Sequence, residues 1–485
     1  MPEESRLDKL KKLKELGIDP YPYTFLRTND AASITHDYSK FEGKEVSVAG
    51  RAIRLRVMGG IYFADLLDGS GKIQLLARKD QLDELSIKIL ELADIGDILG
   101  AKGTVTKTKR GEISIDAKSI VMLSKSLSTL PEKFHGLKDT ELRYRKRHLD
   151  LIMNPNVRSF FTARASILKY MRDFLDERGY TEFETPVLQH VYGGAFAKPF
   201  VTHYHALGTD AFLRISDELF LKRLIIGGFE KVYEVSKDFR NEDIDSTHNP
   251  EFTQIELYEA YKDYEDYMSL IEEMFSGMAH HVTGSKEVVY QDKKLDFSSK
   301  FKKIYWVDEL KKKIGIDVSE FTEDQAKKIA DEEKLATPIK NRLHVADALF
   351  DKYIKPELFQ PTFIVDFPSY MCPLTKDKRG NNKLSERFEF YVAGFEEANS
   401  YSELTDPIEQ RNKFSEQNSE RTKGDAETPP TDYDFIDAIE YGMPPTAGLG
   451  ISIDRISMIL TNNTSIKEVI AFPAVRPEKK ETQGI

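Results

Sequence analysis

The sequence predicts an α+β protein with a small β-barrel followed by a larger mixed domain. Three features indicate this: five short strand patterns between residues 45 and 123, a polar stretch after them, and helices alternating with strands from residue 163 onward. With 485 residues, 40% hydrophobic and 31% charged, the chain is globular and long enough for several domains. Its single cysteine excludes an internal disulfide and any metal site built from several cysteines.

Residues 1–44 are expected to form an N-terminal helical extension. Leucines recur at helical spacing in residues 5–16, and Gly17, Pro20 and Pro22 end that helix. The start lacks the apolar segment of a secretory signal, and no stretch reaches the length of a membrane span. We therefore expect a soluble, cytoplasmic protein without membrane contact.

Residues 45–125 are expected to form a five-stranded barrel. Strands are predicted at 45–51, 61–68, 72–78, 98–109 and 112–123, with a helix at about 80–93. A helix after the third of five strands is typical of an OB-fold, which binds single-stranded nucleic acid on exposed aromatic rings. The net charge of -11 does not favour nucleic acid, and the basic run at 102–110 is more often a solvated hairpin.

Changes in composition divide the rest of the chain into a linker and a large domain. Residues 126–145 are expected to be a linker, and residues 146–485 a large domain that starts with an amphipathic helix at 163–179. A peripheral helical insertion is predicted at about 264–385, where residues 300–335 are rich in Lys and Glu. Polar residues 406–432 predict a surface helix and loop.

The most informative segment is residues 239–258, which has the pattern of a strand, a polar loop and a second strand. Arg240 stands at the end of the first strand, where a guanidinium can bind phosphate through two hydrogen bonds. On the second strand Phe252, Gln254, Glu256 and Tyr258 share one face. A surface hairpin with ordinary salt bridges would contain the same residue types, so this segment alone leaves both interpretations open.

A second segment, Gly448-Leu-Gly-Ile-Ser-Ile-Asp-Arg455, leads into an apolar helix. Glycines such as Gly450 allow the backbone to approach a flat ligand, and Arg455 at the helix start can face an anion. The segment is not a Walker loop, because no Gly-Lys-Ser/Thr follows, and it lacks the dinucleotide-binding spacing.

Together these segments resemble motifs 2 and 3 of the class II aminoacyl-tRNA synthetases, and residues 179–186 (GYTEFETP) resemble motif 1, the dimer element. The resemblance is closest to the lysyl-tRNA synthetases and covers essentially the whole chain, including residues 133–152, 192–203, 213–235 and 387–394. It implies a catalytic domain built on an antiparallel sheet flanked by helices, in a homodimer. The implied reaction joins L-lysine and ATP to lysyl-adenylate and pyrophosphate, then transfers lysine to the 3′ end of its tRNA.

The resemblance also implies a role for individual residues. The catalytic residues are Arg240, on the ATP α-phosphate, and Arg455, on the γ-phosphate. The ATP-binding residues are Arg240, Glu242, His248, Asn249, Phe252, Gly450 and Arg455. The lysine-binding residues are Gly194, Glu218, Glu256, Tyr258, Asn399, Tyr401 and Glu403. The Mg²⁺ ligands are Glu389 and Glu396, on two strands joined by a turn at Ala393-Gly394, and the anticodon-binding residues are Phe63, Gln74 and Glu112.

The acidic pocket has a physical interpretation. Two carboxylates that converge there, Glu256 and Glu403, repel each other and lose hydration, and a bound ammonium relieves both penalties. Such a pocket favours lysine, excludes aspartate and discriminates strongly against ligands without an ammonium. In the barrel, a core Phe63 and a solvated Gln74 and Glu112 remain the alternative to anticodon binding.

Three residues depart from the family pattern at the phosphate end of the expected ATP site: Asp243, Thr247 and Ser452. Three other functions also stay open. An asparaginyl- or aspartyl-type synthetase is disfavoured by Glu256 and Glu403, and a lysylating paralogue of translation factors would lack the barrel. A catalytically silent RNA-binding or regulatory paralogue is disfavoured by the retained arginines and by the pair of metal-type glutamates.

Overall fold

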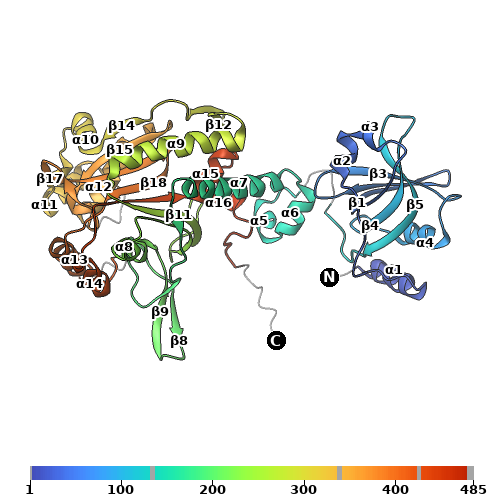
Figure 1. Ribbon diagram of the computed structural model, residues 1–485, viewed down its shortest axis with the longest axis horizontal. Coiled ribbons are helices and arrows are strands. Elements are labelled where there is room, and N and C mark those ends of the chain that lie inside the picture. Colours follow the sequence, from blue (N-terminus) through green and yellow to red (C-terminus); the bar gives the residue numbers. More distant parts are fainter. Residues whose placement is uncertain (1–2, 132–136, 336–340, 423–427, 478–485) are drawn as a thin grey trace. The chain divides into compact units, whose positions relative to one another are not determined.

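The computed structural model describes residues 3–131, 137–335, 341–422 and 428–477. It divides the chain into two compact units, residues 1–136 and 137–485 (Figure 1). Parts of five predicted segments lie outside the described residues: 1–2 of the extension, 132–136 of the linker, 336–340 of the insertion, 423–427 of the surface loop and 478–485 of the large domain.

The first unit is a closed barrel with strand order β1-β2-β3-β5-β4 (Figure 1). Its elements are β1 (Glu45–Met58), β2 (Ile61–Leu67), β3 (Lys72–Arg78), α4 (Glu84–Leu92), β4 (Ile98–Lys107) and β5 (Ile113–Ser124). The predicted OB-fold is confirmed. The predicted strand 45–51 is only the half of β1 that pairs with β4, because the strand continues past a bulge after Ala52 and pairs with β2.

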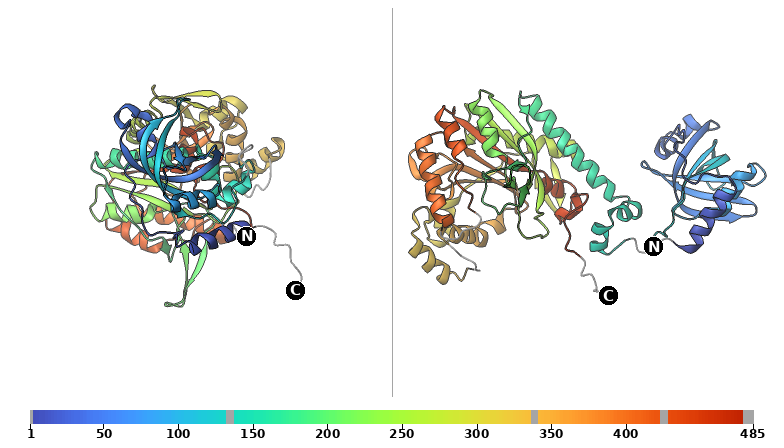
Figure 2. Two further views of the ribbon diagram at one scale, coloured as in Figure 1. Left: turned by 90° about the vertical axis from the view of Figure 1, so that its right-hand side faces the viewer. Right: turned by 90° about the horizontal axis from the view of Figure 1, so that it is seen from below.

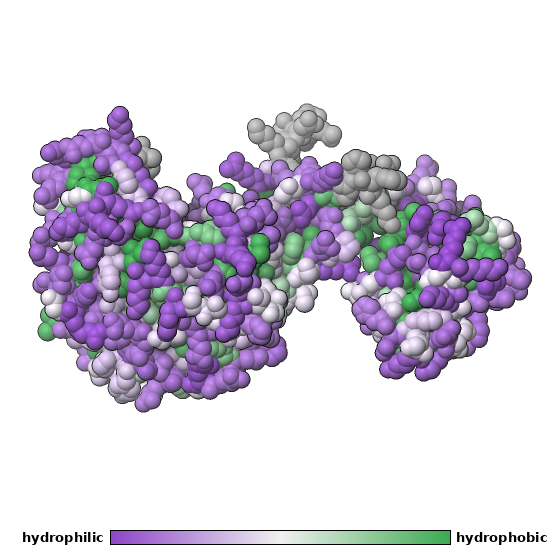
Figure 3. Space-filling model, turned by 90° about the horizontal axis from the view of Figure 1, so that it is seen from above, coloured by the Kyte–Doolittle hydropathy of each residue, from purple (hydrophilic) through white to green (hydrophobic). Residues whose placement is uncertain are grey.

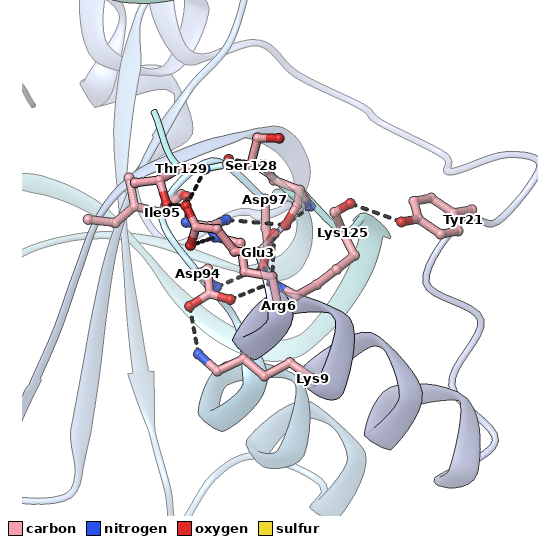
Figure 4. Close-up of polar contacts among 11 residues, drawn as sticks. Glu3, Arg6, Lys9, Tyr21, Asp94, Ile95, Asp97, Lys125, Ser128 and Thr129 are labelled. Atoms are coloured by element: carbon pink, nitrogen blue, oxygen red, sulfur yellow. Dashed lines mark hydrogen bonds and ion pairs between the residues drawn. The ribbon is translucent and has the colours of Figure 1, made fainter. Parts of the chain in front are cut away.

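Three short helices precede the barrel: α1 (Glu4–Glu15), α2 (Ala31–His36) and α3 (Tyr38–Phe41). An ion-pair network connects α1 to the barrel (Figure 4). The fully buried Lys125 ammonium lies 2.7 Å from Asp94 and 2.9 Å from Asp97, and Lys9 of α1 donates to Asp94 at 2.6 Å. Removing one partner of the buried Lys125–Asp97 pair costs about 3–5 kcal/mol. The Lys9–Asp94 pair, which joins α1 to this network, is partly exposed and contributes less.

The second unit is built on a mainly antiparallel sheet with the order β14-β15-β17-β18-β19-β11-β10-β6, in which β16 pairs with β17 (Figure 1). The predicted α+β class with an antiparallel catalytic sheet is confirmed. Among the described strands of this sheet, only the two outer pairs, β6–β10 and β14–β15, are parallel. The strands are β6 (Thr181–Glu182), β10 (Lys231–Phe239), β11 (Glu251–Ala260), β14 (Lys302–Tyr305), β15 (Thr362–Pro368), β16 (Asp377–Lys378), β17 (Asn381–Val392), β18 (Phe395–Ser402) and β19 (Thr446–Ser452).

The two faces of the sheet are covered differently. Helices α7 (Val157–Asp176), α9 (Tyr264–Thr283) and α15 (Ile453–Leu460) form the main core with one face, and α7 packs against α9 (Figure 2). On β11, Ile255 and Leu257 point into this core, so period-2 alternation turns Glu256 and Tyr258 to the opposite face. Helix α8 (Glu218–Ile226) packs on that second face, the one to which Glu256 and Tyr258 point.

Smaller elements complete the second unit. Helices α6 (Arg147–Met153) and α16 (Ile466–Val469) pack against α7, and α5 (Thr140–Arg145) packs against α6. Helix α13 (Pro407–Thr422) packs against α14 (Tyr433–Glu440). Strands β7 (Leu188–Gln189), β8 (Val201–Tyr204) and β9 (Thr209–Leu213) form a separate small sheet, and β12 (Glu287–Tyr290) pairs with β13 (Lys293–Asp296). Within the described residues no helix is long and apolar enough to cross a membrane, and the face in Figure 3 is mainly hydrophilic.

The predicted peripheral insertion at 264–385 is wrong in its extent. Helix α9 lies in the main core, and β14 and β15 belong to the central sheet. The peripheral part is α10 (Trp306–Ile314), α11 (Glu323–Glu332) and α12 (Arg342–Tyr353), which share a smaller core. The Lys- and Glu-rich helices dominate the composition of this region and conceal β15, whose seven residues are all buried.

Candidate active site

A cavity of about 340 Å³ lies on the polar face of the sheet, between the β10–β11 hairpin, β18, β19 and the start of α8. The predicted ATP and lysine residues come from these separate segments. All seven ATP residues line the cavity, together with six of the seven lysine residues: Gly194, Glu218, Glu256, Tyr258, Asn399 and Tyr401. The fold therefore brings the two predicted sets into one site.

Arg240 follows β10 at the edge of the cavity. Its backbone N–H donates to the Pro250 carbonyl at 2.9 Å, which closes the β10–β11 hairpin. The guanidinium lies 5.1 Å from the centre of the Phe252 ring, and its buried Nε has no hydrogen-bond partner among the described residues. A buried donor without a partner is costly, so an anion in the cavity would stabilise this guanidinium.

Arg455, at the start of α15, lies beside the loop of the hairpin. It donates from Nη1 to the Glu396 carbonyl at 2.6 Å, and its Nη2 is 3.3 Å from the His248 Nε2. The other ring nitrogen of His248 lies 2.8 Å from Asp245. Desolvation opposes ionisation of Asp245, but hydrogen bonds from Thr247 and His248 prevail and lower its pKa. The loop is thus held as an ordered turn around Asp245.

Two of the three departures from the family pattern have a structural role here. The Ser452 hydroxyl accepts the Arg455 N–H at 3.2 Å and so caps α15. Thr247 donates its N–H at 2.6 Å and its hydroxyl at 2.9 Å to Asp245. The third departure, Asp243, lines the cavity, and nothing in the structure explains it.

The side chain of Asn249 forms hydrogen bonds within the protein. Its side-chain amide donates to the Glu251 carbonyl at 2.6 Å and accepts the Ala474 N–H at 3.0 Å, and the residue is 8% exposed. This side chain therefore fixes the hairpin to the C-terminal segment. Gly450 lies between Glu256 and Asn399 of the two neighbouring strands, where the missing side chain leaves room for a flat ligand.

Glu389 and Glu396 lie on neighbouring strands, as the sequence predicted. Strand β17 ends before Ala393 and Gly394, whose φ angles of 54° and 83° make the turn into β18. Burial and the nearby charge of Glu396 raise the pKa of Glu389 to about 8. Two repelling carboxylates are a donor set suited to a hard divalent cation such as Mg²⁺, which commonly binds one or two carboxylates plus substrate phosphates.

Glu256 is the carboxylate at the centre of the predicted lysine pocket. It accepts hydrogen bonds from the Ser216 hydroxyl at 2.9 Å, the Gln254 amide at 2.6 Å and the Tyr258 hydroxyl at 3.1 Å. Desolvation, and then the charges of neighbouring carboxylates, raises the pKa of Glu256 to about 8. No cation of the described residues pairs with Glu256, so this site remains available for a ligand ammonium.

Glu403 differs from the expectation that it faces the ligand. It is fully buried, does not line the cavity in the described part of the chain, and forms an ion pair with Lys222. The Lys222 ammonium also donates to Glu218 at 2.5 Å, so it bridges α8 and the strand end at Glu403. The sequence indicates one of these two contacts, because Glu218 and Lys222 are four residues apart on one helix and are therefore neighbours.

Two further contacts shape the pocket. Gly194 has a φ of 86°, and a Cβ atom there would come within 2.7 Å of the Ser216 hydroxyl, so only glycine fits. Arg387, which sequence reasoning missed, donates to the Asn399 side chain at 3.2 Å and to Glu389 at 2.6 Å. Its guanidinium also stacks 5.5 Å from the Tyr401 ring, so it holds both predicted pocket residues of β18.

The barrel brings its three predicted residues to one area. Phe63 and Gln74 share a face of β2 and β3, and Gln74 lies beside β5, which starts after Glu112. The Phe63 ring is partly exposed, with the Arg56 guanidinium 5.6 Å from its centre. Gln74 is 7% exposed and accepts the Ser114 hydroxyl at 3.1 Å, so it is neither solvated nor free in the absence of a ligand.

Comparison with known proteins agrees with this geometry. Residues 139–476 match the family described as tRNA synthetases class II (D, K and N), and residues 46–123 match the OB-fold nucleic acid binding domain. The chain is 48% identical over 483 residues to the Lysine–tRNA ligase of Clostridium perfringens (strain SM101 / Type A), covering 98% of this chain and 96% of the relative. It is also 48% identical over 482 residues to Lysine–tRNA ligase 2 of Methanosarcina mazei, covering 98% and 94%. The chain therefore belongs to the class II tRNA synthetases of the D, K and N group.

Proposed function

We propose that this chain is a lysine–tRNA ligase. It activates L-lysine with ATP, releasing pyrophosphate, and then transfers the lysyl group to the 3′ end of the tRNA for lysine. The observation that carries the proposal is a buried carboxylate, Glu256, which has no cation partner among the described residues and lies in the same cavity as Arg240 and Arg455. Relatives with nearly half of their residues identical over almost the full chain bear the same name.

The first step requires positioning and charge neutralisation. The carboxylate of lysine is already a nucleophile and attacks the α-phosphate of ATP in line, so no general base is needed. In our proposal Arg240 binds the α-phosphate and Arg455 the γ-phosphate, while Phe252, His248, Glu242, Asn249 and Gly450 surround the nucleotide. A guanidinium placed where negative charge builds up stabilises the transition state more than the ground state.

Glu389 and Glu396 would hold Mg²⁺. When bound, the ion neutralises phosphate charge and orients the pyrophosphate leaving group. Burial and the proximity of the two carboxylates together raise the pKa of Glu389, and this supports the assignment. Arg387 contacts Glu389 through a 2.6 Å hydrogen bond and so orients one of the two ligands.

Recognition of lysine rests on charge. Glu256 would receive the side-chain ammonium, assisted by Tyr258, and Glu218 and Gly194 would receive the α-amino group. Glu403 does not contact the ligand in this proposal but holds Lys222 in place. Asn399 and Tyr401 form the wall of the pocket that belongs to β18. Aspartate brings a carboxylate to a pocket whose Glu256 has no cation partner in the described part of the chain, and asparagine leaves Glu256 without a cation, so both are rejected.

The barrel would bind the anticodon of the tRNA. Phe63 stacks on one base, and Gln74 and Glu112 contact base edges, as single-stranded RNA recognition requires. Gln74 must exchange its bond with Ser114 for one to a base. We also propose that the chain acts as a homodimer in the cytoplasm, on the basis of its motif 1-like segment at 179–186 and its single, buried cysteine.

Lysine-dependent exchange of labelled pyrophosphate into ATP tests the function directly. We expect exchange with lysine and at most background exchange with aspartate or asparagine. Exchange with aspartate or asparagine alone would mean that this amino acid, and not lysine, is the substrate. Exchange with none of the three would favour the catalytically silent RNA-binding or regulatory paralogue. Aminoacylation of the tRNA for lysine then tests the second step.

A further inference from the structure

Three buried carboxylates lie together behind the lysine pocket. Asp217, Asp238 and Glu256 each place a carboxylate oxygen within 4.8 Å of the other two. Asp217 and Asp238 are fully buried and Glu256 is 6% exposed, and only Glu256 reaches the cavity in the described part of the chain. Neighbouring carboxylates at this distance and burial do not all ionise, because repulsion and lost hydration both favour a proton.

The cations nearby are already used by other groups. Arg214 lies 2.5 Å from Glu234 and 3.2 Å from Asp238. Lys222 pairs with Glu218 and Glu403, as described above. Asp217 and Glu256 therefore remain without an ion-pair partner among the described residues.

These two carboxylates differ in the donors around them. Glu256 accepts three hydrogen bonds, whereas neither oxygen of Asp217 accepts any within the described structure. Asp217 occupies the N-cap position of α8, where Asp normally accepts a backbone N–H, but its side chain makes no such bond. Hydrogen-bond donors stabilise an anion, so the negative charge belongs on Glu256 and the proton on Asp217.

Burial raises the pKa of Asp217 well above its ordinary value, and the charges of Glu256, Asp238 and Glu234 act in the same direction against that of Arg214. The pKa of Glu256 is also raised. Two coupled acids with raised pKa values hold one proton between them near neutral pH.

We propose that Asp217 is a positioning residue of the lysine pocket: it stays protonated and donates a hydrogen bond to Glu256, which thereby keeps its negative charge and its orientation for the ligand ammonium. This inference rests on the proposed function for the identity of the ligand. The protonation of Asp217 itself does not depend on that identity.

Two variants separate this role from other roles of Asp217. Asp217→Asn keeps the shape and a hydrogen-bond donor without a charge, whereas Asp217→Ala removes the donor. In pyrophosphate exchange near pH 7.5 we expect the lysine KM of Asp217→Asn to stay within about threefold of wild type and that of Asp217→Ala to rise about tenfold or more. The ATP KM should not change in either variant. Asp434→Asn, at an exposed position of α14, is the matched control.

Three kinetic outcomes would overturn the proposal. If Asn raises the lysine KM as much as Ala, Asp217 acts as an anion. If neither variant changes the lysine KM, Asp217 does not act on Glu256. If both variants raise the ATP KM and lower the thermal melting temperature together, Asp217 is only structural.

An infrared difference spectrum gives a readout that does not need activity. The spectrum of wild type minus Asp217→Asn, on the full chain at neutral pH, should contain the C=O band of a protonated carboxyl group. A carboxylate band in its place would overturn the proposal. Absence of lysine-dependent exchange by wild type would contradict the proposed function alone, because the infrared measurement would still decide whether Asp217 is protonated.

Discussion

The Lys222 ammonium forms a buried ion pair with the Glu403 carboxylate, where the sequence led us to expect the ammonium of the ligand. The two glutamates of the pocket therefore have different partners. Glu256 has no cation of its own among the described residues, whereas Glu403 helps to compensate an internal lysine. This division means that substitutions of the two residues should have different consequences.

Glu256→Gln should raise the lysine KM strongly while the ATP KM changes little, because it removes the carboxylate that is available to the ligand. Glu403→Gln should differ from it by lowering the melting temperature. This variant removes one partner of a buried ion pair, which typically costs about 3–5 kcal/mol of folding stability. Exchange kinetics and thermal melts of both variants check this. An unchanged lysine KM in Glu256→Gln would contradict the assignment of the pocket.

The stability of the ligand-free protein should fall as pH rises from about 5 to 8.5. In the folded state Glu256 and Asp217 share one proton, and burial together with their mutual repulsion raises the pKa of this pair above the ordinary values of 4.5 and 3.8, so the folded state binds the proton more tightly than the unfolded state. The resulting stabilisation is complete below pH 4.5 and is lost as pH rises toward 8. Thermal melts across this range should show a shallower decline for Glu256→Gln than for wild type. An equal slope would mean that the charge of Glu256 does not help to hold this proton.

Phe63→Ala should weaken aminoacylation of tRNA by about 1–3 kcal/mol, the usual contribution of one base stacked on an aromatic ring. Pyrophosphate exchange should be nearly unchanged, because Phe63 belongs to the barrel unit and all the ATP residues belong to the other unit. Val57→Ala, which shortens an exposed side chain of the β1–β2 hairpin, is the control. Equal losses in aminoacylation and exchange would indicate that Phe63 only supports the fold.

Local patterns predicted the barrel and the β17–β18 turn, because strand alternation and a Gly turn depend on neighbouring residues. The extent of the insertion could not be predicted, since the fully buried β15 lies among Lys- and Glu-rich helices. The Lys222–Glu403 pair joins residues far apart in sequence, and only the packing of the folded chain brings them together. The bond from Asn249 to the C-terminal segment has the same origin.

Arg240→Ala should lower the kcat of pyrophosphate exchange more than it raises the ATP KM. In the proposed mechanism its guanidinium neutralises charge that builds on the α-phosphate during attack, and loss of one such donor costs roughly 2.7–4 kcal/mol. Lys at this position should restore little activity, because a point charge cannot form the two parallel hydrogen bonds of a guanidinium.

The Arg240 variants should fold, because the buried Nε of this side chain has no hydrogen-bond partner in the described protein and its guanidinium lies against the ring of Phe252. Variants whose thermal melts match wild type can therefore be compared directly in exchange assays. A rise in the ATP KM with an unchanged kcat would mean that Arg240 binds the ground state and the transition state equally. If neither constant changes, the β10–β11 hairpin is not the ATP site, and Arg455 would have to be tested in the same way.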